Sequence, residues 1–189
     1  MGDATGKGVP AALVMSMTCG MLQLAAQASD SSSSPGEVLK RVNEALLVRI
    51  PSNMFVTCFY AILEPRSGSL SYANAGHDLP YLWHGGDALE LRARGMPLGL
   101  MLGTSYEQKE IELLNGETAL FYSDGLVEAH NPEGEMFGFP RLRTFVAERG
   151  QEHSLGNFLL EELYSFVGEG WEQEDDITLL TLRRSATRS

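Results

Sequence analysis

Cysteine is scarce in this sequence. The chain has 189 residues and two cysteines, Cys19 and Cys58, each within an apolar run. Zinc sites place their cysteine and histidine ligands at short, fixed spacings, and these two cysteines match none of them. Because disulfide bonds are rare in the cytosol, the two cysteines are predicted to be buried, reduced thiols of a cytoplasmic protein.

Basic residues are also few. There are 14 Lys and Arg against 25 Asp and Glu, which gives a formal net charge of −11. Proteins that bind nucleic acid carry clustered basic residues to neutralise phosphates, and no basic stripe is visible here. We therefore expect no nucleic-acid partner, and we expect most of the carboxylates to lie on a solvated surface.

The sequence shows no targeting or membrane-spanning segment by inspection. The apolar stretch 11–28 contains several polar residues and is too short and too polar to predict a membrane span. A secretory signal begins with basic residues, but here Asp3 and Lys7 cancel. Myristoylation needs Ser or Thr at position six, where this chain has Gly6. We therefore expect no membrane insertion.

The glycine-rich opening lacks the features of a nucleotide-binding loop. A Walker A loop has four residues between its glycines and a Ser or Thr after its lysine. Here three residues separate Gly2 from Gly6, and Gly8 follows Lys7. This spacing argues against nucleotide binding, and so against a nucleotide-dependent kinase.

Hydrophobic patterning predicts helices near the start and again late, with strands between them. Helices are expected at 11–27, 35–49, 140–148 and 155–167, and strands at 55–63, 70–75, 81–84, 88–91, 108–113, 118–122 and 178–182. This order is typical of an α+β domain rather than of alternating βαβ units. The first helix is apolar nearly all round, so we expect most of its sides to be buried.

Three acidic motifs lie far apart in the chain, each at or near the edge of a predicted strand. They contain Asp3, Asp124, and the neighbours Asp175 and Asp176. Each motif alone could be a turn or a solvated loop. Together they offer the carboxylates that a hard divalent cation requires, and a cation would relieve the repulsion between adjacent aspartates. A metal site used for phosphate chemistry is therefore the leading hypothesis.

His77 ends a predicted strand in the segment Asn74-Ala75-Gly76-His77. A single histidine at such a place is more often a hydrogen-bonding residue of a loop than a metal ligand. We keep it as a secondary candidate for the site.

Taken in order, several segments resemble the bacterial SpoIIE-type phosphatases, a branch of the PPM metal-dependent Ser/Thr phosphatases. The segments are GDATGKGVPAALVM, FVTCFYAILEPRSGSLSYANAGHDLPYLW, GMPLGL, LFYSDGLVEAHNPEGEMFG and DDITLLTL. The resemblance runs from Gly2 to Leu182. Each piece alone is weak evidence, whereas the ordered set is very specific.

The resemblance implies a four-layer αββα sandwich, with two antiparallel sheets flanked by helices and two divalent cations, Mn²⁺ or Mg²⁺, at one end. Asp3 would bridge both metals and Ala4 would offer its backbone carbonyl to one of them. Asp124 and Asp175 would complete the ligands, with Asp176 ranked below Asp175. The same three aspartates, Asp3, Asp124 and Asp175, would be the catalytic residues.

The resemblance also implies a phosphatase domain at 1–185, followed by a tail at 186–189. Its substrate would be a phosphoserine or phosphothreonine protein in bacterial signalling, such as an anti-sigma-factor antagonist. An upstream sensor or receiver domain would precede it in the native chain. Whether the domain forms a homodimer stays open, as does the alternative of a catalytically inactive docking module.

Two departures from the family pattern are visible. Relatives usually bring an upstream pair of strands with a further acidic residue near the metals, and this sequence lacks that segment. We therefore expect an N-terminally truncated domain, whose activity as it stands is in doubt. Lys7 stands where many relatives have histidine, but lysine also occurs there.

Overall fold

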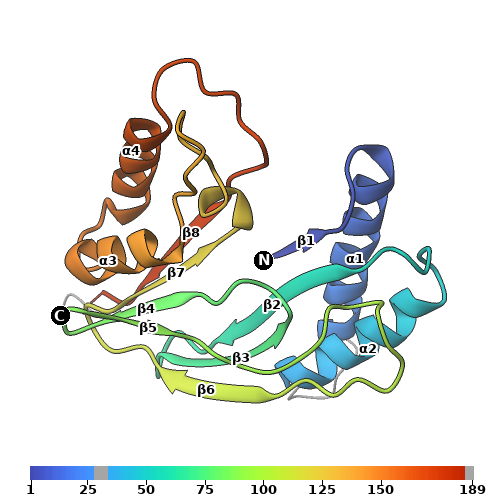
Figure 1. Ribbon diagram of the computed structural model, residues 1–189. Helices are drawn as coiled ribbons and strands as arrows, with labels where there is room; N and C mark the ends of the chain where they lie inside the picture. The colour runs from blue at the N-terminus through green and yellow to red at the C-terminus, as the bar shows by residue number, and fades with distance from the viewer. Residues whose placement is uncertain (28–33, 186–189) are drawn as a thin grey trace. The chain divides into compact units, whose positions relative to one another are not determined.

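The computed structural model describes residues 1–27 and 34–185 (Figure 1). The chain divides into two compact units. Unit 1 comprises Met1–His77 and Arg92–Glu112, and unit 2 comprises Asp78–Leu91 and Leu113–Ser189. The predicted tail, 186–189, lies outside the described residues.

Unit 1 is a four-stranded antiparallel sheet with two helices against it (Figure 1). The strand order is β1-β2-β3-β6, and helix α2 packs on β2 and β3. The elements are β1 (Gly2–Ala4), α1 (Val9–Gln27), α2 (Pro35–Leu47), β2 (Val56–Leu63), β3 (Ser69–Ala75) and β6 (Gln108–Glu112).

Alternation along the strands decides which side chains of unit 1 face its helices. Val56 and Cys58 of β2 belong to the same buried cluster as the apolar face of α2, and so does Ala4 of β1. Because successive side chains of a strand point to opposite faces, Thr57 and Asp3 lie on the other face. The strand that carries Asp3 is thus anchored through Ala4, while Asp3 itself remains exposed.

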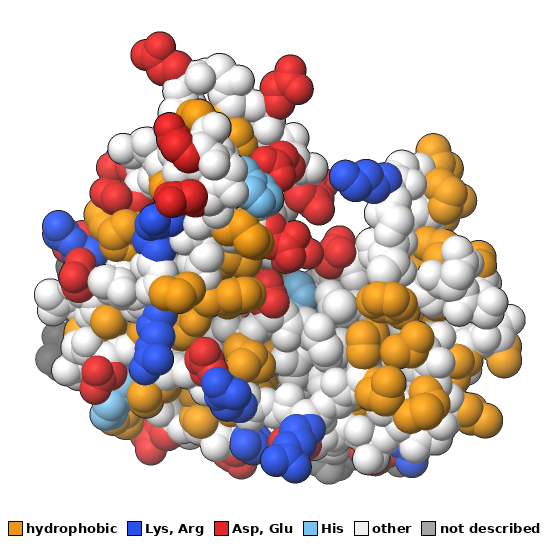
Figure 2. Space-filling view, in the orientation of Figure 1, with side chains coloured by type: hydrophobic (Ala, Val, Ile, Leu, Met, Phe, Trp, Pro, Cys, Tyr) orange, Lys and Arg blue, Asp and Glu red, His pale blue; other side chains and the backbone are white. Residues whose placement is uncertain are grey.

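Helix α1 differs from the prediction that most of its sides are buried. Only Val14, Thr18 and Ala25 are buried, and Val9 is 73% exposed. Figure 2 shows hydrophobic side chains on the surface along this helix. The helix contacts α2 and β1 along one side. Its apolar composition alone therefore led to a wrong prediction of how much of its surface is buried.

Among the described residues, α1 is also long and apolar enough to cross a membrane by length and composition. This is weak evidence, because core helices and signal sequences meet the same criteria. In the structure α1 is part of unit 1, through its contacts with α2 and β1.

The cysteine prediction is confirmed in part. Both thiols are free, and Cys58 is buried. Burial raises the pKa of the Cys58 thiol to about 11, so it is protonated at neutral pH. Cys19 is exposed, because it lies on the uncovered side of α1, and its predicted burial was wrong.

Asn43 ties the loop after Leu98 to helix α2. It is fully buried, its Nδ2 donates to the Met101 carbonyl at 2.9 Å, and its Oδ1 accepts from the Gly99 N–H at 2.8 Å. A buried amide with both ends bonded holds the loop at a fixed place on the helix.

Replacing Asn43 with alanine is expected to lower the free energy of unfolding by about 2–3 kcal/mol, since buried backbone groups would lose their partners. Urea unfolding followed by circular dichroism would measure the change. The matched control is Asn53→Ala at an exposed position, which should have little effect. Equal stability of the two variants would contradict the anchoring role.

Unit 2 is a second antiparallel sheet, of order β5-β4-β7-β8, with two helices (Figure 1). Helix α3 packs on β4 and β5, and α4 packs on α3 and β8. Strand β7 is buried at every position. The elements are β4 (Tyr81–His84), β5 (Asp87–Glu90), β7 (Thr118–Tyr122), the 3₁₀ turn η1 (Asp124–Leu126), α3 (Phe139–Arg149), α4 (Leu155–Val167) and β8 (Leu179–Arg183).

The predicted α+β class, with two antiparallel sheets flanked by helices, is confirmed. Two elements were not predicted. One is β1, whose three residues are too few to show a pattern and which exists through pairing with β2. The other is η1, the single turn that begins at Asp124.

Candidate metal centre

Asp124 stands where the buried strand β7 gives way to η1. Ser123 is extended and Asp124 begins the turn, so the carboxylate lies at the end of the strand. The Gly125 N–H donates to its Oδ1 at 2.9 Å. One carboxylate oxygen is therefore oriented by the backbone of the turn.

Ser123 holds the segment before β8 beside this turn. Its hydroxyl donates to the Asp176 carbonyl at 2.9 Å and accepts from the Thr178 N–H at 2.9 Å. The Ser123 N–H donates to the Thr178 carbonyl at 3.1 Å. We call these three bonds the Ser123 clamp.

Gly125 permits this close approach. A Cβ at Gly125 would lie 2.6 Å from the Asp176 carbonyl oxygen, which is too close for any side chain. The clamp and the glycine together bring the segment with Asp175 and Asp176 against the turn with Asp124. The segments that carry two of the predicted ligands, Asp124 and Asp175, are thus neighbours within unit 2.

The acidic run itself is exposed, and its members differ in what they contact. Asp175 Oδ1 accepts from the Asp176 N–H at 2.7 Å, and Gln173 Nε2 donates to the Asp175 carbonyl at 2.8 Å. Glu174 pairs with His130 at 3.0 Å. Figure 2 shows acidic side chains gathered over this part of unit 2.

Asp78 is an acidic residue of the site that the sequence predictions missed. Its Oδ2 is buried and has no hydrogen-bond partner among residues 1–27 and 34–185. Burial, followed by the charges of Asp124 and Glu128, raises the pKa of Asp78 to about 6. A bound cation would stabilise the ionised carboxylate and so offset the burial and the charge repulsion that raise its pKa. The oxygen donors here therefore suit a divalent metal. The sequence held one sign of this residue: Asp78 is an acid that directly follows the candidate His77.

This raised pKa predicts a pH dependence for the metal-free protein. The folded-state value of about 6 lies above the usual 3.8, so between these values the folded state binds more protons than the unfolded state. Stability should therefore fall as pH rises through that window. Melting temperatures measured from pH 4 to 7 with a chelator should show this fall in the wild-type protein and a smaller one in Asp78→Asn. The exposed substitution Asp87→Asn is the control. Parallel profiles for wild type and Asp78→Asn would refute the assignment.

Asp3 and Ala4 lie in unit 1, on β1. Asp3 is exposed and pairs with Thr57 of β2, and Ala4 is buried and pairs with Val56. Thr5 fixes the end of the strand, because its hydroxyl donates to the Phe55 carbonyl at 2.9 Å and accepts from the Phe55 N–H at 2.8 Å. The structure thus supplies a strand for Asp3 within this sequence.

The side chains alone do not form a ready-made metal site. No group of three or more His, Cys, Asp or Glu that could hold a metal ion occurs in the part of the chain that the structure describes. Asp124 and Asp175 share unit 2, whereas Asp3 and Ala4 belong to unit 1. The candidate ligands are all oxygen donors, as Mg²⁺ and Mn²⁺ prefer.

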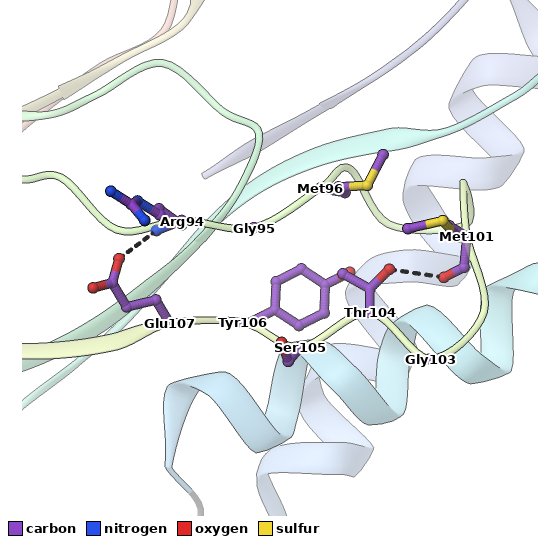
Figure 3. Close-up of a pocket in the computed structure, with 9 residues that line it drawn as sticks. All are labelled: Arg94, Gly95, Met96, Met101, Gly103, Thr104, Ser105, Tyr106 and Glu107. Atoms are coloured by element: carbon purple, nitrogen blue, oxygen red, sulfur yellow. Dashed lines mark hydrogen bonds between the residues drawn. The ribbon is translucent and has the colours of Figure 1, made fainter.

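A pocket of about 590 Å³ lies in unit 1 between two arms of the segment 94–107 (Figure 3). The Tyr106 ring lies between the arms, and the Thr104 hydroxyl donates to the Met101 carbonyl at 2.9 Å. None of the predicted metal ligands lines this pocket. It is therefore not part of the candidate centre.

Comparison with known proteins finds relatives that match nearly the whole chain. RsbU of Bacillus subtilis, described as a phosphoserine phosphatase, is 29% identical over an alignment of 188 positions, which covers 96% of this chain and 54% of RsbU. IcfG of Synechocystis is 26% identical, over 98% of this chain and 33% of IcfG. The chain thus spans about half of RsbU and a third of IcfG.

Solved structures share the fold. The SiaA-PP2C domain of Pseudomonas aeruginosa superposes with a TM-score of 0.79 and 25% identity, over 96% of this chain and 72% of that one. The PP2C phosphatase domain of SpoIIE from Bacillus subtilis gives 0.76 and 19%, over 96% and 54%. The family model described as stage II sporulation protein E (SpoIIE) matches residues 1–185. On this match, the chain belongs to the SpoIIE family of phosphatase domains, as its sequence motifs predicted.

Proposed function

We propose that this chain is a metal-dependent protein phosphatase domain that hydrolyses phosphoserine or phosphothreonine. The observation that carries the proposal is the Ser123 clamp, which holds the segment of Asp175 against the turn of Asp124. Two segments that each carry a candidate carboxylate, from distant points of the sequence, are held side by side there. Family membership supports the reaction class.

Asp3, Ala4, Asp124 and Asp175 would hold two divalent cations, Mn²⁺ or Mg²⁺. Two solved proteins of the same fold support this choice of metal for the family: a SpoIIE phosphatase domain presoaked with manganese, and RsbX in complex with magnesium. When bound, such cations lower the pKa of a coordinated water and offset the charge that develops on a transferring phosphoryl group.

The chain's own residues would set the charge and the position of this centre. Three carboxylates, about −3 in total, leave two divalent cations with surplus positive charge for a phosphate. The bond from the Gly125 N–H keeps the Asp124 carboxylate in one orientation. His77 and Asp78 are consecutive. The turn after β3 therefore leads directly to Asp78, whose pKa is raised in part by the charge of Asp124.

Direct attack by water fits the thiols better than a covalent phosphoenzyme. Cys58 is buried with a pKa of about 11, so it is not a thiolate at neutral pH. Cys19 is exposed on α1 and lies in no motif that would activate it. The leaving serine or threonine oxygen would depart in line with the attacking water.

The substrate would be a phosphoprotein of a bacterial signalling pathway, with an anti-sigma-factor antagonist as the first candidate. RsbU, which bears the name phosphoserine phosphatase, supports this class. An upstream sensor or receiver domain in the native protein would regulate the domain in the cytoplasm.

The test is hydrolysis of a phosphoserine peptide by the native protein, with and without Mn²⁺, together with calorimetric titration of the metal. Hydrolysis that depends on Mn²⁺ and stops with EDTA supports the proposal. Metal binding without hydrolysis of any phosphopeptide favours the inactive docking module. Absence of both would rule out the metal centre.

A further inference from the structure

His77 is held rigidly at the end of β3. The Asn74 side chain forms two hydrogen bonds of 2.8 Å with the His77 backbone, one to its carbonyl and one from its N–H. Gly76 between them has a φ of 70°, and a Cβ there would lie 2.8 Å from Pro97. The backbone therefore presents the histidine in one place, and His77 is only 8% exposed.

The imidazole contacts Thr57 on the strand beside Asp3. His77 Nδ1 lies 3.0 Å from Thr57 Oγ1, and this oxygen lies 3.4 Å from the Asp3 carbonyl. Thr57 and Asp3 are directly opposite in the ladder between β2 and β1, so their side chains share a face. His77, Thr57 and Asp3 thus form a row across the sheet of unit 1.

The threonine hydroxyl has one proton, so it can donate in only one direction. If His77 accepts at Nδ1, the proton points to the histidine and the Asp3 carbonyl loses this donor. If His77 carries its proton on Nδ1, the histidine donates to Thr57 and the hydroxyl donates onward to Asp3. The tautomer of His77 therefore decides whether the Thr57 hydroxyl adds a bond to the Asp3 carbonyl beyond the strand pairing.

This support matters because β1 is a short strand at the edge of its sheet. It has three residues, and its only partner strand among the described residues is β2. A short strand at the edge of a sheet opens more easily than the core. A ligand on such a strand loses affinity if its backbone moves by a fraction of an ångström.

We propose that His77, with its proton on Nδ1, is a positioning residue that fixes the Asp3 strand through the Thr57 hydroxyl and thereby raises the affinity for the first metal. The proposal rests on the proposed function, in which Asp3 is a metal ligand. His77 itself touches neither metal nor substrate in this role.

The test uses a pair of amides at position 77. An asparagine amide reaches the place of the imidazole Nδ1, whereas a glutamine amide reaches that of Nε2. In the native protein, His77→Gln and Thr57→Val are each expected to weaken Mn²⁺ binding about 10-fold, while His77→Asn and Thr57→Ser stay within about threefold of wild type. The double variant His77→Gln/Thr57→Val should bind no more weakly than either single variant, because both remove the same support.

Mn²⁺ affinity is measured by titration calorimetry, and melting of the metal-free protein is measured alongside it. His153→Gln, at an exposed position, is the control. Equal affinity of His77→Gln and wild type overturns the proposal. So does an equal loss in His77→Asn and His77→Gln that follows their melting temperatures, since this would indicate a packing role only. Wild-type protein that binds no Mn²⁺ refutes the proposed function itself, and the positioning role falls with it.

Discussion

Replacing Asp124 with asparagine is expected to lower the Mn²⁺-dependent hydrolysis of a phosphoserine peptide by at least about 100-fold, since loss of a ligand should exceed the 10–100-fold effects of residues that support ligands. The substitution removes a negative charge from the centre but keeps the size of the side chain. An amide oxygen can still accept the N–H bond from Gly125, so the turn should survive. The change therefore separates the charge of Asp124 from its structural role.

The measurement is kcat/KM at saturating Mn²⁺, with calorimetric titration of the metal on the same samples. Asp87→Asn makes the same chemical change at an exposed position of β5 and should leave the rate unchanged. A melting temperature close to wild type would show that Asp124→Asn folds. If Asp124→Asn keeps its rate within about threefold, Asp124 is not a metal ligand.

Replacing Phe137 with alanine is expected to lower the stability of unit 2 by about 3–5 kcal/mol, the usual cost of removing a buried phenylalanine. Phe137 is 2% exposed, and its ring meets that of Phe166 edge-on at 5.5 Å. The Arg141 guanidinium lies 5.4 Å from the ring centroid. The Phe137 N–H also donates to the Ala129 carbonyl at 2.8 Å, which closes the loop that follows η1.

Tryptophan fluorescence provides a readout specific to unit 2, because both tryptophans of the chain, Trp83 and Trp171, belong to it. Urea unfolding followed at this signal should show a lower midpoint for Phe137→Ala. Phe139→Ala is the matched control, since Phe139 is 46% exposed and should cost about 1 kcal/mol or less. Similar midpoints for the two variants would show that Phe137 does not organise this core.

The elements were predictable because their signals are local. The strand at 118–122 appears in the structure with the predicted ends, as does the helix at 155–167. The apolar run at 118–122 reflects a strand that is buried at every position, and the 3.6-residue period at 155–167 reflects a helix buried along one side. The three acidic motifs were recognisable for a similar reason, since each combines an acid with glycine or a second acid at a strand end.

Other features depended on partners far away in the sequence. β1 exists because Gly2–Ala4 pair with β2, more than fifty residues later. Helix α1 is exposed because it contacts its unit along one side, whatever its composition suggests. The acid Asp78 was missed for the same reason, because its burial and the charges that raise its pKa come from other elements.

The sequence by itself determined the α+β class, the family and the identity of Asp3, Asp124 and Asp175 as candidate ligands, because residue types and their order carry that information. Only the tertiary structure decided that the Ser123 clamp joins Asp124 to the segment of Asp175, and that His77 reaches the strand of Asp3 through Thr57. Hydrogen bonds between residues about fifty positions apart in the sequence, such as that from Ser123 to Asp176, depend on how the strands pair and the loops pack. No local pattern of residues encodes that pairing.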